Sequence, residues 1–219
     1  MIIYHGSKKK IEKPIVSGSN PHNDYGPAFY LTLDLDSAKS WACKNNELGI
    51  VNKYSIRDNV FNNFNVLDLT NKEKYSVLNW IAILIHFRIL SPTFKIKNKP
   101  ALDWLEKYFV DVEQYDVIIG YRADDAYFRF PSRFITNDLS LEDLEDVFLS
   151  GDLGVQYVFV SKRAIESLSF EEKIDCDSSF INHYYNIVKE ASKRFDDLLN
   201  KTSDPNKTYL FDLMRKDNE

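Results

Sequence analysis

The stretch Tyr4-His5-Gly6-Ser7 decides how the rest of the chain is interpreted. It follows the apolar pair Ile2-Ile3, so the sequence predicts a first strand that ends on a polar His-Gly pair. A glycine at the end of a strand lets a ligand come close to the backbone, and a neighbouring imidazole can donate or accept a hydrogen bond. The stretch therefore indicates a sheet edge that binds a ligand.

Two later stretches support this interpretation, because each contains a predicted strand. They are Gly26-Pro27-Ala28-Phe29-Tyr30-Leu31-Thr32 and Val155-Gln156-Tyr157-Val158-Phe159-Val160. Between them, β-branched and aromatic runs predict further strands. The predicted strands after the first therefore lie at residues 28–32, 50–56, 65–69, 115–120 and 155–160, and the last of these is the final strand that we expect.

Helices are predicted between and after these strands. Asp34 to Ser37 offer N-cap residues for a short amphipathic helix that ends near residue 44. Thr70 and Glu73 have the spacing of a capping box, and a mostly buried helix is expected over residues 75–90, ending near Ser91-Pro92. Further helices are expected around residues 102–109, 140–149 and 161–168, with a long amphipathic helix over residues 178–200.

The chain has 219 residues, of which 44% are hydrophobic, so it can form one domain of ordinary size, alone or with an appendage. A soft boundary near Asp175 separates a domain over residues 1–175 from a helical extension over residues 176–219. We expect the extension to pack on the domain, and docking to a partner is the alternative.

Charge and hydropathy restrict the partners. The net charge of −5 gives no bulk positive field that would attract nucleic acid or an anionic membrane. One local basic cluster, formed by Lys8, Lys9, Lys10 and Lys13, is either a solvated loop or a binding patch. The longest apolar run, residues 80–85, is too short to cross a bilayer, and no signal peptide is recognised. We therefore expect a cytoplasmic protein with no membrane partner.

Metal chemistry is not expected from the sequence. Two cysteines far apart argue against a disulfide framework and against a cysteine-ligated metal, and the four histidines show no ligand spacing. These residues are Cys43, Cys176, His5, His22, His86 and His183.

The three opening stretches resemble the His, Tyr and Glu motifs of the diphtheria-toxin-like class of ADP-ribosyltransferases, which includes the poly-ADP-ribose polymerases. The chain also looks similar to a bacterial family of unknown function in that superfamily, whose members carry this spacing and a segment like residues 120–125. The likeness covers roughly residues 1–168. It implies an α+β fold: a split β-sandwich of two small antiparallel sheets flanked by helices, with an additional C-terminal helix.

The resemblance implies a cleft for NAD⁺ between the two sheets. The backbone of Gly6 would hold the nicotinamide carboxamide through paired N–H and C=O bonds, which needs a residue with no side chain in the way. His5 would bind the adenosine ribose, with Ser7 supporting the same region and Tyr4 beside it.

Aromatic side chains would form the walls of this cleft. Tyr30 would stack on the nicotinamide ring, an interaction worth about 1 kcal/mol. Tyr25 or Phe29 would complete the walls, although core packing is the preferred interpretation of Phe29. Arg122 is a further candidate for a cofactor contact.

Gln156 stands where the class has a glutamate. The reaction breaks the bond between nicotinamide and ribose and develops positive charge on the sugar, which a carboxylate would stabilise. Two opposite charges about 4 Å apart are worth roughly 4 kcal/mol at an effective dielectric near 20, or about a thousandfold in rate. With an amide at this position, three outcomes remain open: slow mono-transfer, transfer aided by another acid, or no chemistry.

Asp124 and Asp125 are the acids that the sequence offers as replacements. They lie in the segment 121–130, which mixes carboxylates, arginines and aromatics and forms either a loop pinned by Arg–Asp pairs or a site wall. Beside Arg122, one carboxylate can be paired while the other acts as a base.

The expected function is NAD-dependent mono-ADP-ribosyl transfer to a macromolecule, either protein or nucleic acid. The catalytic candidates are His5, Tyr30, Gln156, Asp124 and Asp125. By family analogy the protein is a bacterial toxin or defence effector with a neutralising antitoxin protein. The alternatives are an NAD-binding module of weak or no activity, an NAD glycohydrolase that uses the same cleft, and a scaffold for interactions.

Overall fold

The computed structural model describes residues 1–16, 19–44, 47–57, 59–123, 127–149, 154–200 and 204–217. It has an α+β fold with a sheet of three strands and a sheet of four. The three-stranded sheet has the order β1 (Ile2–Ser7), β3 (Ile50–Ser55), β7 (Ser169–Asp175) and is antiparallel throughout. The four-stranded sheet has the order β2 (Phe29–Leu31), β6 (Val155–Phe159), β5 (Val117–Tyr121), β4 (Val66–Asp68).

The expectation of two purely antiparallel sheets is wrong at one edge. Strand β4 pairs with β5 in parallel, while β5 and β2 are both antiparallel to β6. A parallel pair needs a long crossover, and the helices between β4 and β5 supply it. They are α2 (Val77–Phe87), α3 (Pro92–Lys97) and α4 (Lys99–Leu105), followed by two short 3-10 turns (Glu106–Tyr108 and Val112–Gln114).

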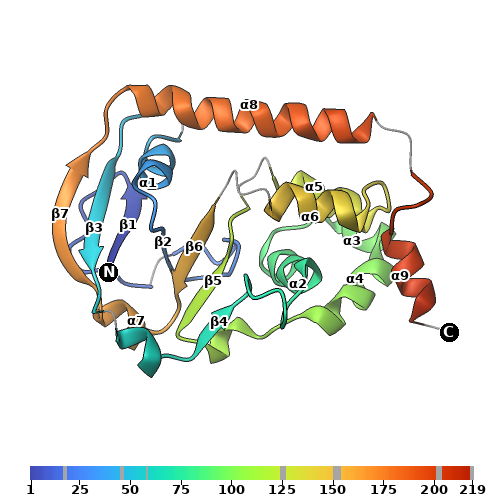
Figure 1. The fold of residues 1–219 in the computed structure, drawn as a ribbon, viewed down its shortest axis with the longest axis horizontal. Coiled ribbons are helices and arrows are strands. Elements are labelled where there is room, and N and C mark those ends of the chain that lie inside the picture. The colour runs from blue at the N-terminus through green and yellow to red at the C-terminus, as the bar shows by residue number, and fades with distance from the viewer. Residues whose placement is uncertain are drawn as a thin grey trace.

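The layers follow from the alternation of side chains along the strands. In β5, Val117 packs between the two sheets while Ile118 faces the helices. In β6, Phe159 packs between the sheets and Val158 faces the helices. Helix α1 (Leu35–Ala42) covers the outer face of the three-stranded sheet. The three-stranded sheet is therefore followed by the four-stranded sheet and then by a group of helices around α2 (Figure 1). Helix α1 packs on the face of the three-stranded sheet that points away from the core between the sheets.

Several predicted caps are confirmed. Asp34 Oδ2 accepts from Ser37 N–H at 2.8 Å and begins α1. Ser140 Oγ accepts from Asp143 N–H at 3.1 Å at the start of α6 (Leu141–Leu149). Ser161 Oγ accepts from Ala164 N–H at 3.2 Å before α7 (Lys162–Glu166).

Other helix boundaries differ from the prediction. The capping box of α2 is formed by Ser76 and Asn79, not by Thr70 and Glu73, because the chain makes a turn after β4 before the helix begins. Ser91 caps a new helix, α3, rather than ending the previous one.

Besides α3, one strand and two α-helices of the described chain have no counterpart in the prediction. Strand β7 escapes it because its central residues are charged and exposed. It pairs with β3 through the backbone and through an ion pair between Lys53 and Glu172, with 2.6 Å between Nζ and Oε1. Helix α5 (Arg129–Ile135) contains Pro131, which normally indicates a break but is tolerated in a first turn. Helix α9 (Leu210–Lys216) is too short to give a periodic signal.

The long helix α8 (Ser179–Leu199) runs along one side of the molecule, from the end of β7 towards α9 (Figure 1). Phe180 lies at the α1 end, where Lys39 Nζ is 4.7 Å from its ring centroid. Phe195 is buried near the other end against Phe130, with ring centroids 5.1 Å apart. None of the helices in the described part of the chain is long and apolar enough to span a membrane.

Asp116, just before β5, joins three elements. Its Oδ2 accepts from Asn65 N–H at 2.8 Å, next to β4, and its Oδ1 accepts from Arg163 Nε at 2.6 Å, in α7. The Arg163 guanidinium, which also donates through Nη2, holds the pKa of Asp116 well below its usual range. The ionised carboxylate is therefore part of the folded structure.

We expect Asp116→Asn to lower the free energy of unfolding by roughly 1–2 kcal/mol near pH 7, a value kept small because Arg163 is partly exposed. The pKa of Asp116 in the folded protein lies below the unfolded value of 3.8. The stability that the ionised carboxylate adds to the wild type is therefore complete above that pH and shrinks as the pH falls below it. Urea unfolding at about pH 7 and about pH 3 measures the difference. An equal difference at both pH values would contradict this account of Asp116.

Candidate active site

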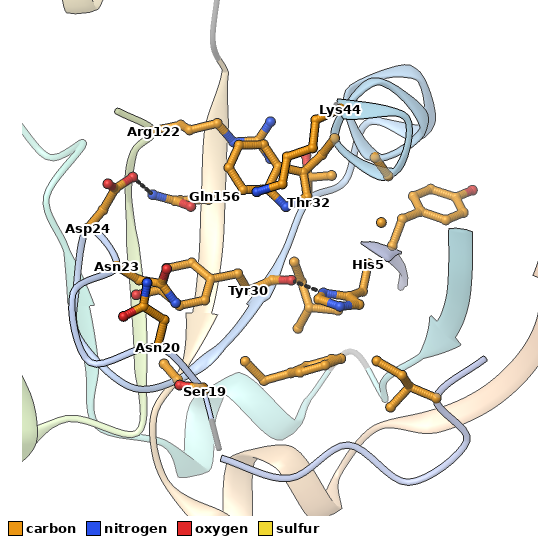
Figure 2. Close-up of a pocket in the computed structure, with 18 of the residues that line it drawn as sticks. His5, Ser19, Asn20, Asn23, Asp24, Tyr30, Thr32, Lys44, Arg122 and Gln156 are labelled. Carbon is orange, nitrogen blue, oxygen red and sulfur yellow. Dashed lines mark hydrogen bonds between the residues drawn. The ribbon is translucent and has the colours of Figure 1, made fainter. Parts of the chain in front are cut away.

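A cavity of about 800 Å³ opens where β1 and β2 separate (Figure 2). Many residues that line it belong to the stretches singled out in the sequence. Of the expected site residues, the cavity wall includes Tyr4, His5, Gly6, Tyr30, Arg122 and Gln156. The structure thus brings together three stretches that lie far apart in the chain.

The register between β2 and β6 places Tyr30 and Gln156 on one face of their sheet. Tyr30 pairs with Val158 and Leu31 with Tyr157, so the next position sets Thr32 opposite Gln156. Because side chains two residues apart point to the same face, the Tyr30 ring and the Gln156 amide both reach the cavity.

The two sheets touch at one bridged pair and then diverge. Tyr4 N–H donates to Thr32 O at 2.8 Å, and Thr32 N–H donates to Tyr4 O at 2.9 Å. A longer antiparallel ladder would next pair Gly6 with Tyr30. Instead, His5 Nδ1 lies 2.7 Å from Tyr30 O and takes the place that the Gly6 N–H would have in such a ladder.

The backbone of Gly6 consequently faces the cavity. Met1 and Ile56 exchange both of their backbone hydrogen bonds. Along a strand the backbone N–H and C=O groups of successive residues point to opposite edges. Those of the odd residues of β1 are therefore directed to β3, and those of Tyr4 and Gly6 to the other edge. Tyr4 is satisfied there by Thr32. No hydrogen bond among the described residues occupies Gly6 N–H or C=O on this edge. One donor and one acceptor therefore stand side by side at the cavity wall.

The absence of a side chain at Gly6 has a different cause from the one expected. A Cβ built on Gly6 would lie 2.1 Å from Ala38 O and 2.9 Å from Ala42 N, both in the backbone of α1. Glycine is needed because α1 packs directly on β1, and not to clear space for a ligand.

The His5 ring has a defined tautomer. Its Nδ1 faces a carbonyl oxygen, which only accepts, so Nδ1 carries the proton and Nε2 is left as an acceptor. The ring stacks on Phe29, with centroids 4.3 Å apart and an interplanar angle of 29°. Burial lowers the pKa of His5, although the bond to Tyr30 O opposes this effect. His5 is therefore a neutral acceptor at neutral pH.

The Gln156 side chain is oriented by its neighbours. Gln156 is 3% exposed. Its Nε2 donates to Asp24 Oδ2 at 3.1 Å (Figure 2) and to Tyr121 O at 3.2 Å. Both partners are acceptors, so the amide can be placed in one orientation only. Its Oε1 has no hydrogen-bond partner among the described residues and remains available at the cavity wall.

Asp24 is a carboxylate in this cavity that the sequence reasoning missed. Arg88 Nη2 donates to its Oδ1 at 2.6 Å, and Ala123 N–H donates to its Oδ2 at 2.9 Å. Burial raises the pKa of Asp24, and the Arg88 charge opposes that rise. The only signal for Asp24 in the sequence is its position directly before the Tyr25-Gly26 pair. Asp124 and Asp125, the acids expected to fill this role, lie outside the described residues.

The Tyr30 phenol is tied to the preceding loop. Its hydroxyl donates to Gly26 O at 2.7 Å and accepts from Tyr25 N–H at 3.1 Å. These bonds fix the ring at the cavity, close to Asn23 (Figure 2).

Two expected site residues do not line the cavity. Tyr25 is 1% exposed in the core, where its hydroxyl donates to Tyr121 O at 2.9 Å. Ser7 Oγ donates to Lys9 O at 2.5 Å and accepts from Asn52 Nδ2 at 3.0 Å. The first side chain packs the core and the second holds the loop after β1, so neither side chain lines the cavity.

Positive charge gathers around Trp41 at the cavity wall. Lys44 Nζ lies 4.0 Å from the centroid of this indole, and Arg122 Cζ lies 5.3 Å from it. All three residues line the cavity, and Figure 2 shows Lys44 and Arg122 on the same side of it. Within the described ranges, no group of three or more His, Cys, Asp or Glu side chains is arranged to hold a metal ion.

We expect His5 to titrate below its ordinary pKa of 6.5, because burial disfavours the imidazolium form. Since the unfolded chain takes up this proton first, protonation of His5 destabilises the fold as the pH falls below 6.5. A ¹⁵N NMR titration reports both the pKa and the tautomer, and it should show a protonated Nδ1 and a bare Nε2. A pKa at or above 6.5, or a proton on Nε2, would contradict this description.

Comparison with known proteins gives one finding. Residues 1–170 match a family described as "Protein of unknown function (DUF3990)". No curated protein and no solved structure matches the chain. The matched residues include every strand except β7, of which they contain only Ser169 and Phe170, and the whole set of cavity residues other than Tyr184 of α8. The chain therefore belongs to the DUF3990 family of proteins of unknown function.

Proposed function

We propose that this protein is an NAD-dependent mono-ADP-ribosyltransferase. The observation that carries the proposal is the unpaired backbone edge of Gly6, which offers one N–H and one C=O to the cavity beside two acceptors, His5 Nε2 and Gln156 Oε1. A ligand that fits this set has an amide to pair with Gly6 and hydroxyl groups to donate to the two acceptors.

NAD⁺ has these groups in its carboxamide and its two riboses. The carboxamide can accept from Gly6 N–H and donate to Gly6 C=O, the nicotinamide ribose can donate to Gln156 Oε1, and the adenosine ribose can donate to His5 Nε2. The Tyr30 ring, held by two hydrogen bonds, offers a flat surface for the nicotinamide. The volume of about 800 Å³ lies within the usual range for small-molecule sites.

The charged wall fits the remaining part of the dinucleotide. NAD⁺ carries a diphosphate, and Arg122 and Lys44 lie on the same side of the cavity around Trp41. Guanidinium and ammonium groups are the usual protein partners of phosphate oxygens.

The proposed reaction breaks the bond between nicotinamide N1 and ribose C1′. Nicotinamide leaves with the bonding electrons, positive charge develops on C1′ and its ring oxygen, and a nucleophile of the acceptor forms the new bond at C1′ and loses its proton. Gln156 Oε1 would hold a ribose hydroxyl during this step. The acceptor is a protein or nucleic acid. The biological role would be that of a bacterial toxin or defence effector, restrained by an antitoxin protein.

Incubation of the purified protein with NAD⁺ labelled in the adenosine half, in the presence of cell extract, tests the proposal. Release of nicotinamide together with label on a macromolecule is the expected result. Release without transfer would make the protein a glycohydrolase, and saturable binding without release would make it an NAD-binding module. Absence of both binding and release would overturn the proposal.

A pair of substitutions at Tyr30 tests the stacking contact. We expect Tyr30→Ala to weaken NAD⁺ binding about fivefold, corresponding to a stacking energy of about 1 kcal/mol. Tyr30→Phe is the matched control, because it keeps the ring and removes the hydroxyl that holds the Gly26 loop. Isothermal titration calorimetry measures both affinities, and equal weakening by the two variants would show that the hydroxyl, and not the ring, is responsible.

A further inference from the structure

The cavity contains an amide where the proposed chemistry calls for a negative charge, and a carboxylate directly behind that amide. We infer that Asp24 and Gln156 form one functional pair in which the charge is carried by the loop residue, and that Asp24 positions the Gln156 amide for the ribose. This inference rests on the proposed function and assigns a role to Asp24 within the same site.

The Asp24 carboxylate is held as an acceptor on both oxygens. Oδ1 accepts from Arg88 Nη2 at 2.6 Å, while Oδ2 accepts from Ala123 N–H at 2.9 Å and from Gln156 Nε2 at 3.1 Å. All three partners are N–H donors, so the arrangement suits an ionised carboxylate. The Asp24 side chain is 8% exposed and is bonded from three directions, so it cannot turn away from Gln156.

The bond to Asp24 determines what Gln156 presents to a ligand. With Nε2 directed at two acceptors, Asp24 and Tyr121 O, the amide oxygen is the atom left for the cavity. A hydrogen bond from Nε2 to a carboxylate polarises the amide and makes its oxygen a stronger acceptor, as in other hydrogen-bonded chains. Asp24 therefore acts on the ligand through Gln156 and takes part in no covalent step.

This arrangement reverses the simplest expectation for the site. A glutamate at position 156 would restore the residue of the resembling class, but here it would face Asp24 Oδ2 and Tyr121 O with an acceptor instead of a donor. Two carboxylates about 3 Å apart cannot both remain ionised, and the one O–H of a protonated glutamate could serve only one of these two acceptors. The pair tolerates a carboxylate at one of the two positions and needs a donor at the other.

Four variants test the pair: Asp24→Asn, Gln156→Glu, the double variant, and Asp116→Asn. Asp116 is the matched control, because its side chain is also 8% exposed and paired with an arginine, Arg163, but does not line the cavity. For each protein, kcat and KM for NAD⁺ cleavage are measured together with the midpoint of urea unfolding, which shows that the variant is folded.

We expect Asp24→Asn and Gln156→Glu each to lower kcat by about 100-fold, the usual effect of removing one preorganised group. The double variant restores a donor at position 24 and a carboxylate at position 156, so its kcat should exceed that of the better single variant at least about tenfold. Recovery stays partial because Tyr121 O still faces an acceptor and because the amide nitrogen of the asparagine would face the donor Ala123 N–H. Asp116→Asn should match the wild type in kcat.

Two results would overturn the inference. One is a Gln156→Glu variant as active as the wild type while Asp24 is present, and the other is a double variant in which the two losses in kcat simply multiply. If Asp24→Asn does not fold, the Gln156→Glu result decides alone. If the wild type neither binds nor cleaves NAD⁺, the proposed function is wrong, but the unfolding midpoints still test the contact between Asp24 and Gln156. Non-additive midpoints of the single and double variants would support that contact, and additive ones would overturn it.

Discussion

The site depends on the point where β1 and β2 stop pairing. One bridged pair, Tyr4 with Thr32, joins the two sheets, and the strands separate immediately afterwards. The His5 imidazole holds the strands in this state by bonding to Tyr30 O. Without that bond, closure of the ladder would satisfy the backbone of Gly6 within the protein and remove the edge that faces the cavity. The packing of α1 on Gly6 supports the same strand from its other face.

The charges around this opening are arranged in two groups. Asp24 and Arg88 form a nearly buried pair behind Gln156, and Lys44 and Arg122 lie around Trp41. The first group presents an oriented acceptor to the cavity, while the second presents positive charge. A ligand with hydroxyl donors at one end and phosphate oxygens at the other matches this division, so the net negative charge of the chain does not exclude the dinucleotide that we propose.

Local sequence signals predicted the parts of the structure that are determined locally. The caps at Asp34, Ser140 and Ser161 and the strands with β-branched runs appear close to their expected positions. The elements that escaped prediction depend on distant partners: β7 is a strand because it pairs with β3, and the parallel pairing of β4 with β5 follows from the intervening helices.

The site shows the same difference between features determined locally and features that depend on distant contacts. Motif spacing was enough to bring His5, Tyr30 and Gln156 to one cavity, because each lies on a strand. It could not identify Asp24, whose bond to Gln156 spans 132 positions of sequence, nor could it show that Tyr25 belongs to the core. Side-chain roles of this kind depend on contacts that no local pattern encodes.

The central claim, that the edge of Gly6 is open and takes a carboxamide, has a direct measurement. In an NMR titration of ¹⁵N-labelled protein with nicotinamide and with NAD⁺, the amide proton of Gly6 should move downfield as it gains a hydrogen bond. The amide of Ile3, whose N–H is directed towards β3 and not towards the cavity, should stay nearly unchanged. A Gly6 amide that does not respond to saturating ligand, while other resonances do, would contradict the account.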